Sequence, residues 1–103
     1  MMKSRKVSLS ESAQQDLFDI EVWLEAQTSK SFARNYTDRL VDYCMRLDIA
    51  SQRGTPRDDV LPGLRIVGFE RRLTIAFAVH DDRVEILRIF RGGRDWEADL
   101  SED

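Results

Sequence analysis

The chain has 103 residues, of which 42% are hydrophobic and 34% are charged, and these values fit one domain with a single modest core. The formal net charge of −3 argues against a protein that coats nucleic acid indiscriminately, although a local basic surface remains compatible with it. No apolar run reaches the length of a membrane span and the first residues do not resemble a secretory signal, so we expect a cytoplasmic protein.

A short strand at residues 6–9 and a helix that begins after Ser10 are the first predicted elements. The Ser10 hydroxyl can accept a hydrogen bond from an unpaired backbone N–H of the first turn, which makes this residue a suitable N-cap. The helical spacing continues to about Gln27. One face of this helix has apolar side chains that we expect to pack inward, namely Ala13, Leu17, Ile20 and Leu24.

A second apolar patch is predicted on the same helix. Phe18 and Val22 are four residues apart and point almost opposite to the inward face, which Trp23 flanks. Because the helix does not need these side chains for its own core, the patch favours contact with a partner.

The second helix is predicted to begin after Thr28 and Ser29, which are suitable caps, and to end at Gly54 and Pro56. Two helices joined by so short a link form an antiparallel hairpin. The second helix also has one apolar stripe, which consists of Phe32, Tyr36, Leu40, Tyr43 and Leu47.

Three strands are predicted next, at residues 63–69, 72–79 and 83–90, because these segments are rich in β-branched and aromatic residues and alternate with short polar turns. They form an antiparallel meander whose last strand, covered on both faces, lies inside the sheet. The middle strand has one apolar face and one face of smaller side chains, and we expect the second face to be the floor of a groove; it consists of Thr74, Ala76, Ala78 and His80.

The chain has one cysteine, Cys44, and one histidine, His80. A single cysteine cannot form an internal disulfide, and these two side chains are too few for a zinc cluster. We therefore expect neither a metal nor a cofactor.

Four stretches, in this order and spacing, resemble the ParE toxins of the RelE/ParE superfamily: SESAQQDLFDIEVWL, PGLR, RLTIAFAVHDDRVEILRIF and GGRDWE. The resemblance covers nearly the whole chain and implies a single α+β domain, residues 1–103, with the order β-α-α-β-β-β. It also implies the toxin of a bacterial type II toxin–antitoxin pair. Such a toxin is neutralised by a ParD-like antitoxin in a hetero-oligomer, inhibits DNA gyrase by protein contact, and meets nucleic acid only through these partners.

The alternative function is that of the RelE-like branch, whose members are ribosome-dependent mRNA endonucleases. Cleavage of RNA at a 2′-hydroxyl requires a base, an acid and cations for the phosphate, which in the RelE-like pattern are lysines, arginines and a terminal tyrosine or histidine. Here the lysines are Lys3, Lys6 and Lys30, all before the sheet, and no tyrosine or histidine follows Gly93. We therefore predict no catalytic residue, with His80 as the one candidate base. A general interaction module is a third possibility.

Charge is segregated along the chain, since residues 10–28 contain five acids and no lysine or arginine, whereas residues 64–94 contain seven arginines and four acids. This pattern predicts a basic sheet opposite an acidic helix. The arginines either pair within the protein or bind an acidic partner, for which the planar guanidinium is well suited. We expect Arg71, Arg72 and Arg83, at hairpin turns, to be solvated only.

The remaining arginines form the predicted contact with the target. Arg65 alternates with apolar neighbours on its strand and is expected on the polar side, whereas Arg88 shares a face with Val84, Ile86 and Phe90 and is as well explained by a structural ion pair. Beyond the last strand, the Gly92-Gly93 turn frees the side chains that follow it, and Trp96 either covers the core edge or contacts a partner. The predicted target-binding residues are Arg65, Arg88, Arg91, Arg94 and Trp96, and the predicted antitoxin-binding residues are Phe18, Val22, Trp23 and Arg65.

Overall fold

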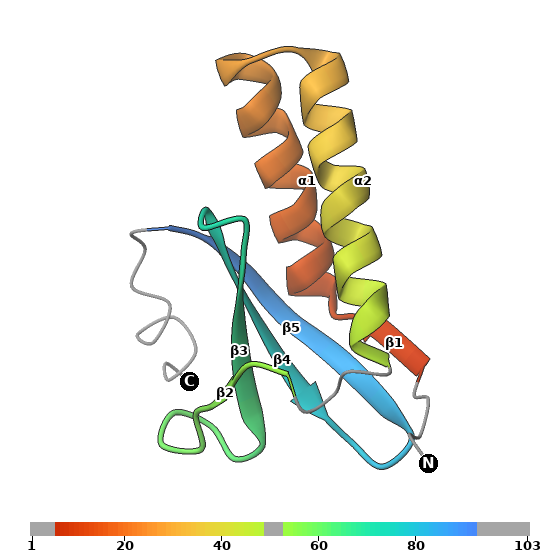
Figure 1. The fold of residues 1–103 in the computed structure, drawn as a ribbon, viewed down its shortest axis with the longest axis vertical. Helices are drawn as coiled ribbons and strands as arrows, with labels where there is room; N and C mark the ends of the chain where they lie inside the picture. The colour runs from red at the N-terminus through yellow and green to blue at the C-terminus, as the bar shows by residue number, and fades with distance from the viewer. Residues whose placement is uncertain (1–5, 49–52, 93–103) are drawn as a thin grey trace.

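A helical hairpin packs on one face of a mixed β-sheet (Figure 1) in the computed structural model, which describes residues 6–48 and 53–92. The predicted α+β fold is therefore confirmed. No helix of these two ranges is long and apolar enough to cross a membrane. The elements in chain order are β1 (Lys6–Leu9), α1 (Glu11–Gln27), α2 (Lys30–Met45), the 3₁₀ helix η1 (Arg46–Asp48), β2 (Thr55–Pro56), β3 (Leu64–Phe69), β4 (Leu73–Val79) and β5 (Arg83–Arg91).

The sheet has the strand order β1-β5-β4-β3-β2 over the described residues. Strands β3, β4 and β5 form the predicted antiparallel meander, and the short β2 extends it along β3. Strand β1 pairs with β5 in parallel, in a register that runs from Lys6 opposite Arg83 to Leu9 opposite Ile86. Strand β5 is thus an interior strand, as predicted, but only its first half is covered by β1.

Both helices begin at the predicted caps. The Ser10 hydroxyl accepts a hydrogen bond from the Ala13 N–H (3.0 Å), and it donates one to the Leu87 carbonyl on β5 (2.8 Å). The Ser29 hydroxyl accepts a hydrogen bond from the Phe32 N–H in the same way (3.1 Å). Because Ser10 binds both α1 and β5, the start of the helix is fixed to the sheet.

The larger hydrophobic cluster lies between the hairpin and the sheet, and most residues of the two predicted stripes belong to it. Phe32 is the exception, because its ring is 41% exposed and stacks on Tyr36 from outside, with 6.3 Å between the ring centroids. The cluster is built around Ala13, Ile20, Leu24, Ala33, Tyr36, Leu40, Cys44, Leu47, Phe69, Leu73, Ile75, Phe77, Val84, Ile86 and Ile89.

The opposite face of the sheet has a smaller apolar cluster, so the predicted open groove floor is wrong at Ala76. This side chain is fully buried with Leu64 and Phe90. Val60 and Leu61, which precede β3, pack against the same cluster. The small residues of β4 therefore accommodate a covering segment of the chain itself.

The end of the second helix also differs from the prediction. Helix α2 ends at Met45 and the 3₁₀ turn ends at Asp48, well before Gly54. Gly54 has φ +86°, and a Cβ at this position would lie 2.3 Å from the Ile66 carbonyl oxygen. The glycine is thus required where the chain approaches β3 closely, and it does not terminate the helix.

A β-bulge changes the facing of side chains along β5. Ala76 pairs with Arg88 but the next residue, Phe77, pairs with Ile86, so Leu87 is the extra residue. Val84 and Ile86 belong to the cluster under the helices, whereas Phe90, beyond the bulge, belongs to the opposite cluster. The prediction that Phe90 shares a face with them was wrong, because a bulge reverses the alternation.

Candidate functional site: a pocket between the helices and the sheet

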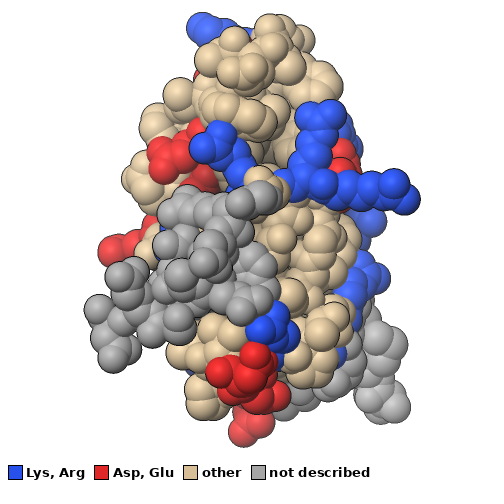
Figure 2. All heavy atoms as spheres, turned by 90° about the vertical axis from the view of Figure 1, so that its left-hand side faces the viewer, with Lys and Arg blue, Asp and Glu red and all other residues tan. Residues whose placement is uncertain are grey.

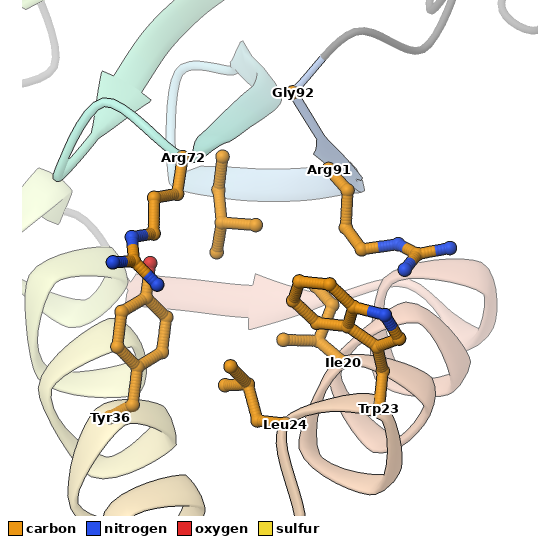
Figure 3. A pocket seen from close by; sticks show the side chains of 8 residues that line it. Ile20, Trp23, Leu24, Tyr36, Arg72, Arg91 and Gly92 are labelled. Atoms are coloured by element: carbon orange, nitrogen blue, oxygen red, sulfur yellow. The ribbon is translucent and has the colours of Figure 1, made fainter. Parts of the chain in front are cut away.

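A pocket of about 670 Å³ opens where the two helices meet the adjoining ends of β4 and β5 (Figure 3). We call it the helix–sheet pocket. Its volume falls within the range of about 300–1,000 Å³ that is usual for small-molecule sites. Its lining consists of Ile20, Trp23, Leu24, Tyr36, Arg72, Leu73, Arg91 and Gly92.

The apolar part of the lining comes from the edge of the larger cluster. Ile20 and Leu24 are one turn apart on the inward face of α1, and Leu73 is the first residue of β4. Trp23 lies beside them on α1 and remains 40% exposed. The stripe that builds the core therefore also supplies the apolar floor of the pocket.

Arg91 forms one rim of the pocket. Its guanidinium carbon lies 4.7 Å from the centroid of the Trp23 ring, a cation–π arrangement across β5 and α1. The backbone behind it is held by the Gly92 N–H, which donates to the Arg72 carbonyl at 2.6 Å. A Cβ on Gly92 would lie 3.1 Å from that oxygen, so a larger residue would fit only if the two chain segments shifted slightly apart. The structure thus brings together two predicted site residues, Trp23 and Arg91.

Tyr36 and Arg72 form the other end of the pocket. The Tyr36 side chain is only 2% exposed, and its hydroxyl has no hydrogen-bond partner among the described residues. Figure 3 shows the Arg72 guanidinium beside this hydroxyl. Burial raises the pKa of Tyr36, and Glu70 acts in the same direction, whereas Arg72 and Arg39 oppose them.

The turn between β3 and β4 positions Arg72. Glu70 and Arg71 have positive φ values of 49° and 59°, and the Arg72 N–H donates to the Phe69 carbonyl at 3.1 Å, which closes a tight turn. Arg39 on α2 holds Glu70 through two hydrogen bonds, at 3.0 and 3.1 Å. The hydrogen bond from Arg39 also lowers the pKa of Glu70. Arg72, predicted to be solvated only, is therefore placed by this anchored turn on the pocket wall.

Arg88, in contrast, turns into the fold. Its Nε and Nη2 donate to the two carboxylate oxygens of Asp16 on α1, at 2.7 and 3.0 Å. The same carboxylate accepts the Ile89 N–H at 2.9 Å, on the part of the β5 edge that β1 does not reach. Of the two readings left open for Arg88, the structural ion pair is the one this geometry supports.

Arg65 lies away from the pocket, because it pairs with Phe77 four residues before the end of β3. Its guanidinium donates to the carbonyls of Arg53 and Gly54, at 3.0 and 3.1 Å, and so holds the chain that enters β2. The two remaining predicted target-binding residues, Arg94 and Trp96, lie outside the described residues.

The predicted apolar patch on α1 is exposed: Phe18 is 63% and Val22 is 48% accessible. Trp23, at 40%, connects this side of the helix with the helix–sheet pocket. Figure 2 shows lysine and arginine side chains gathered midway up one face of the molecule, with few acids among them. The exposed surface therefore offers apolar and basic regions.

The candidate base His80 lies in the β4–β5 turn, where its backbone N–H donates to the Arg83 carbonyl at 2.8 Å. Its Nε2 atom is 3.4 Å from Glu85 Oε1, a hydrogen-bonding distance between two partly exposed side chains. No group of three His, Cys, Asp or Glu side chains within residues 6–48 and 53–92 could hold a metal ion. This turn thus has the features of a surface hairpin.

Sequence reasoning missed Tyr36 and Arg72 as pocket residues. Tyr36 was assigned to the inward stripe, and only its hydroxyl signalled a polar requirement within an apolar face. Arg72 directly follows the two turn residues and pairs with no carboxylate in the described part of the chain, but a sequence does not show which side of the turn faces the helices.

The family model described as the ParE toxin of the type II toxin–antitoxin system parDE matches residues 7–96. A solved structure of a chromosomal ParDE toxin–antitoxin system from P. aeruginosa has 24% identity and a TM-score of 0.75, covering 85% of this chain and 96% of that one.

Two further solved structures share the fold. A conserved hypothetical protein of Helicobacter pylori has 21% identity and a TM-score of 0.54, with 91% of this chain and 98% of that one covered. A chain of the E. coli DinJ-YafQ toxin–antitoxin complex has 17% identity and a TM-score of 0.53, with 85% and 92% covered. No curated protein matches the sequence significantly.

Proposed function

Because the chain belongs to the ParE toxin family of type II toxin–antitoxin systems, we propose that it inhibits DNA gyrase by protein contact and that a ParD-like antitoxin neutralises it. The observation that carries the proposal is the continuous exposed surface from Phe18 and Val22 through Trp23 to Arg91. Large aromatic and arginine side chains are the residues that contribute most to protein interfaces.

The chemistry of this surface supports binding without bond cleavage. Among the described residues, the pocket brings together two arginines, a tryptophan and a tyrosine, and its described lining includes no carboxylate or histidine that would serve as a general base. Arg88, whose guanidinium would otherwise face a phosphate, donates instead to both carboxylate oxygens of Asp16 through Nε and Nη2. A gyrase inhibitor therefore agrees better with these residues than an mRNA endonuclease does.

The antitoxin is proposed to bind through the apolar patch on α1. A flexible tail that folds on binding would bury Phe18 and Val22 and place acidic side chains near the basic surface. Trp23 lies between these two regions and would belong to both contacts. Arg65 remains a proposed contact at the other end of β3.

A pair of assays on the purified protein distinguishes the two functions. We expect the toxin to inhibit supercoiling by gyrase and to produce DNA breaks, while a reporter mRNA translated on ribosomes stays intact. Addition of the antitoxin should restore supercoiling. Site-specific cleavage of the mRNA that disappears in His80→Ala would instead establish the endonuclease.

The antitoxin contact is tested by changing Phe18 and Val22 together to Ser. We expect the complex to weaken by about 1–3 kcal/mol, because both side chains are anchors of the proposed interface. Calorimetric titration with the antitoxin measures this change, and Met45→Ser, at an exposed apolar residue on α2, is the matched control. Equal affinity of the double variant and the control, with the fold intact, would exclude the patch from the interface.

A further inference from the structure

The buried hydroxyl of Tyr36 is a donor without an acceptor. Less than 1 Å² of this oxygen is accessible, and no described residue offers it a hydrogen bond. An unpaired buried polar group is unfavourable, so most such groups in proteins meet a side chain, a water or a ligand. The hydroxyl lies at the end of the helix–sheet pocket, where a ligand group would find it.

A cation adjoins that hydroxyl. The Arg72 guanidinium lies next to it in Figure 3, and Arg72 forms no ion pair with a carboxylate within the described ranges. Arg72 directly precedes β4 and lines the same pocket, and a ligand that reaches the buried hydroxyl would require this flexible side chain to rotate. A guanidinium and a phenol side by side offer several N–H donors and one O–H donor to a single anionic group.

Apart from Arg91 at the far end, the rest of the lining that the structure describes is mainly apolar. Ile20, Leu24 and Leu73 line its middle, and the Trp23 ring lines the far end, with Arg91 against the ring. In Figure 3 the two guanidinium groups lie at opposite sides of this apolar stretch. A ligand with an acidic head at Tyr36 and an apolar body that reaches Trp23 would match both parts.

We propose that the helix–sheet pocket binds a small amphipathic carboxylate, whose head group accepts hydrogen bonds from Tyr36 and Arg72 and whose apolar body packs between Leu24, Leu73 and Trp23. The occupant is a free small acid, and the inference does not depend on the identity of the toxin's target. Such a ligand would stabilise the free protein by binding the folded state alone.

The test is a titration of the free, full-length protein with 4-phenylbutyrate, followed by NMR chemical shifts of the backbone amides. We expect saturable shifts that include Leu24, Leu73 and Gly92. The neutral analogue 4-phenylbutan-1-ol should bind about tenfold more weakly, because it lacks the charge that the guanidinium recognises. Acetate, which has the head group alone, should produce no saturable shifts.

Three variants locate the head group. Tyr36→Phe removes only the hydroxyl and Arg72→Gln removes only the charge, and each should weaken 4-phenylbutyrate binding several-fold while the amide spectrum remains folded. Arg83→Gln, at an exposed arginine of the β4–β5 turn outside the pocket, should leave binding unchanged. Absence of saturable binding, equal binding of the alcohol, or equal losses in all three variants would overturn the proposal.

Discussion

Arg88 and Arg91 are three residues apart on the same strand, yet the first is closed into the fold and the second stands at the rim of a pocket. Arg88 donates to both carboxylate oxygens of Asp16, a residue that is only 9% exposed. Arg91 lies over the face of an exposed tryptophan, with 4.7 Å between its guanidinium carbon and the ring centroid. The role of each arginine is therefore set by the acceptors that its neighbours offer, and not by its place in an arginine-rich segment.

Removal of the Asp16 carboxylate, which binds Arg88, should have the largest effect on stability. Asp16→Ala leaves the Arg88 guanidinium and the Ile89 N–H without their acceptor, and we expect a loss of about 3 kcal/mol of unfolding free energy. Chemical denaturation measures it.

Two further variants on the same helix calibrate this loss. Asp16→Asn, which keeps an acceptor but no charge, should lie between the wild type and the alanine variant. Asp19→Ala, an exposed carboxylate one turn away, should change stability by less than about 0.5 kcal/mol. If Asp16→Ala and Asp19→Ala had equal effects, the hydrogen bonds that Asp16 accepts from Arg88 and Ile89 would not stabilise the fold.

Alkaline pH should lower the free energy of unfolding, because two buried groups ionise. Burial raises the pKa of Tyr36 above 10.0 and that of Cys44 from 9.0 to about 12, so both groups ionise more readily in the unfolded chain. Their stabilising contribution is complete below the unfolded pKa values and is lost as the pH rises toward the folded ones. Each proton contributes a slope of up to about 1.4 kcal/mol per pH unit.

Chemical denaturation at pH values from about 8 to 11 measures this dependence, because that range contains the pKa values of both groups in the unfolded chain. In Tyr36→Phe, the free energy of unfolding should fall less steeply above pH 10.0, the ordinary tyrosine pKa. The variant has no phenol to ionise, so only Cys44 contributes to the slope. A decline of unchanged steepness in this variant would show that the hydroxyl is already paired or hydrated in the folded state.

Arg91 should contribute least to stability and most to growth arrest. Arg91→Ala removes a single exposed cation–π contact, and we expect a loss below about 1 kcal/mol. Arg53→Ala is the matched control, since Arg53 lies 5.5 Å from the Tyr43 ring in a similar contact. Growth arrest in cells should fall for Arg91→Ala alone. Full toxicity of that variant would remove Arg91 from the recognition surface.

Local signals explain why much of the fold was predictable. Ser10 and Ser29 are followed by clear helical stripes, and the β3–β5 meander consists of β-branched runs divided by short turns. The bulge at Leu87 was not predictable, because Leu and Ile are compatible with either face of a strand covered on both sides. The end of α2 was placed too late, because Gly54 signals a close approach to Ile66 that is distant in sequence.

The site was predictable only where exposure follows from helical period. Phe18 and Val22 fall outside the inward stripe, so their exposure could be read from spacing alone. The pocket depends instead on a tertiary arrangement of α1, α2 and the β3–β4 turn. Arg72 and Tyr36 meet across that arrangement, and no pattern within one segment indicates it.

The pairing of β1 with β5 sets the order in which the protein is completed during synthesis. The Ser10 hydroxyl donates to the Leu87 carbonyl across 77 positions of sequence, so β1 cannot pair until β5 has been synthesised. The helical hairpin consists of local contacts and forms early, while its inward face stays uncovered until the strands have been made. Gly92, which lines the pocket, is also made late. A chain whose synthesis has not yet reached Gly92 therefore has the hairpin without the pocket.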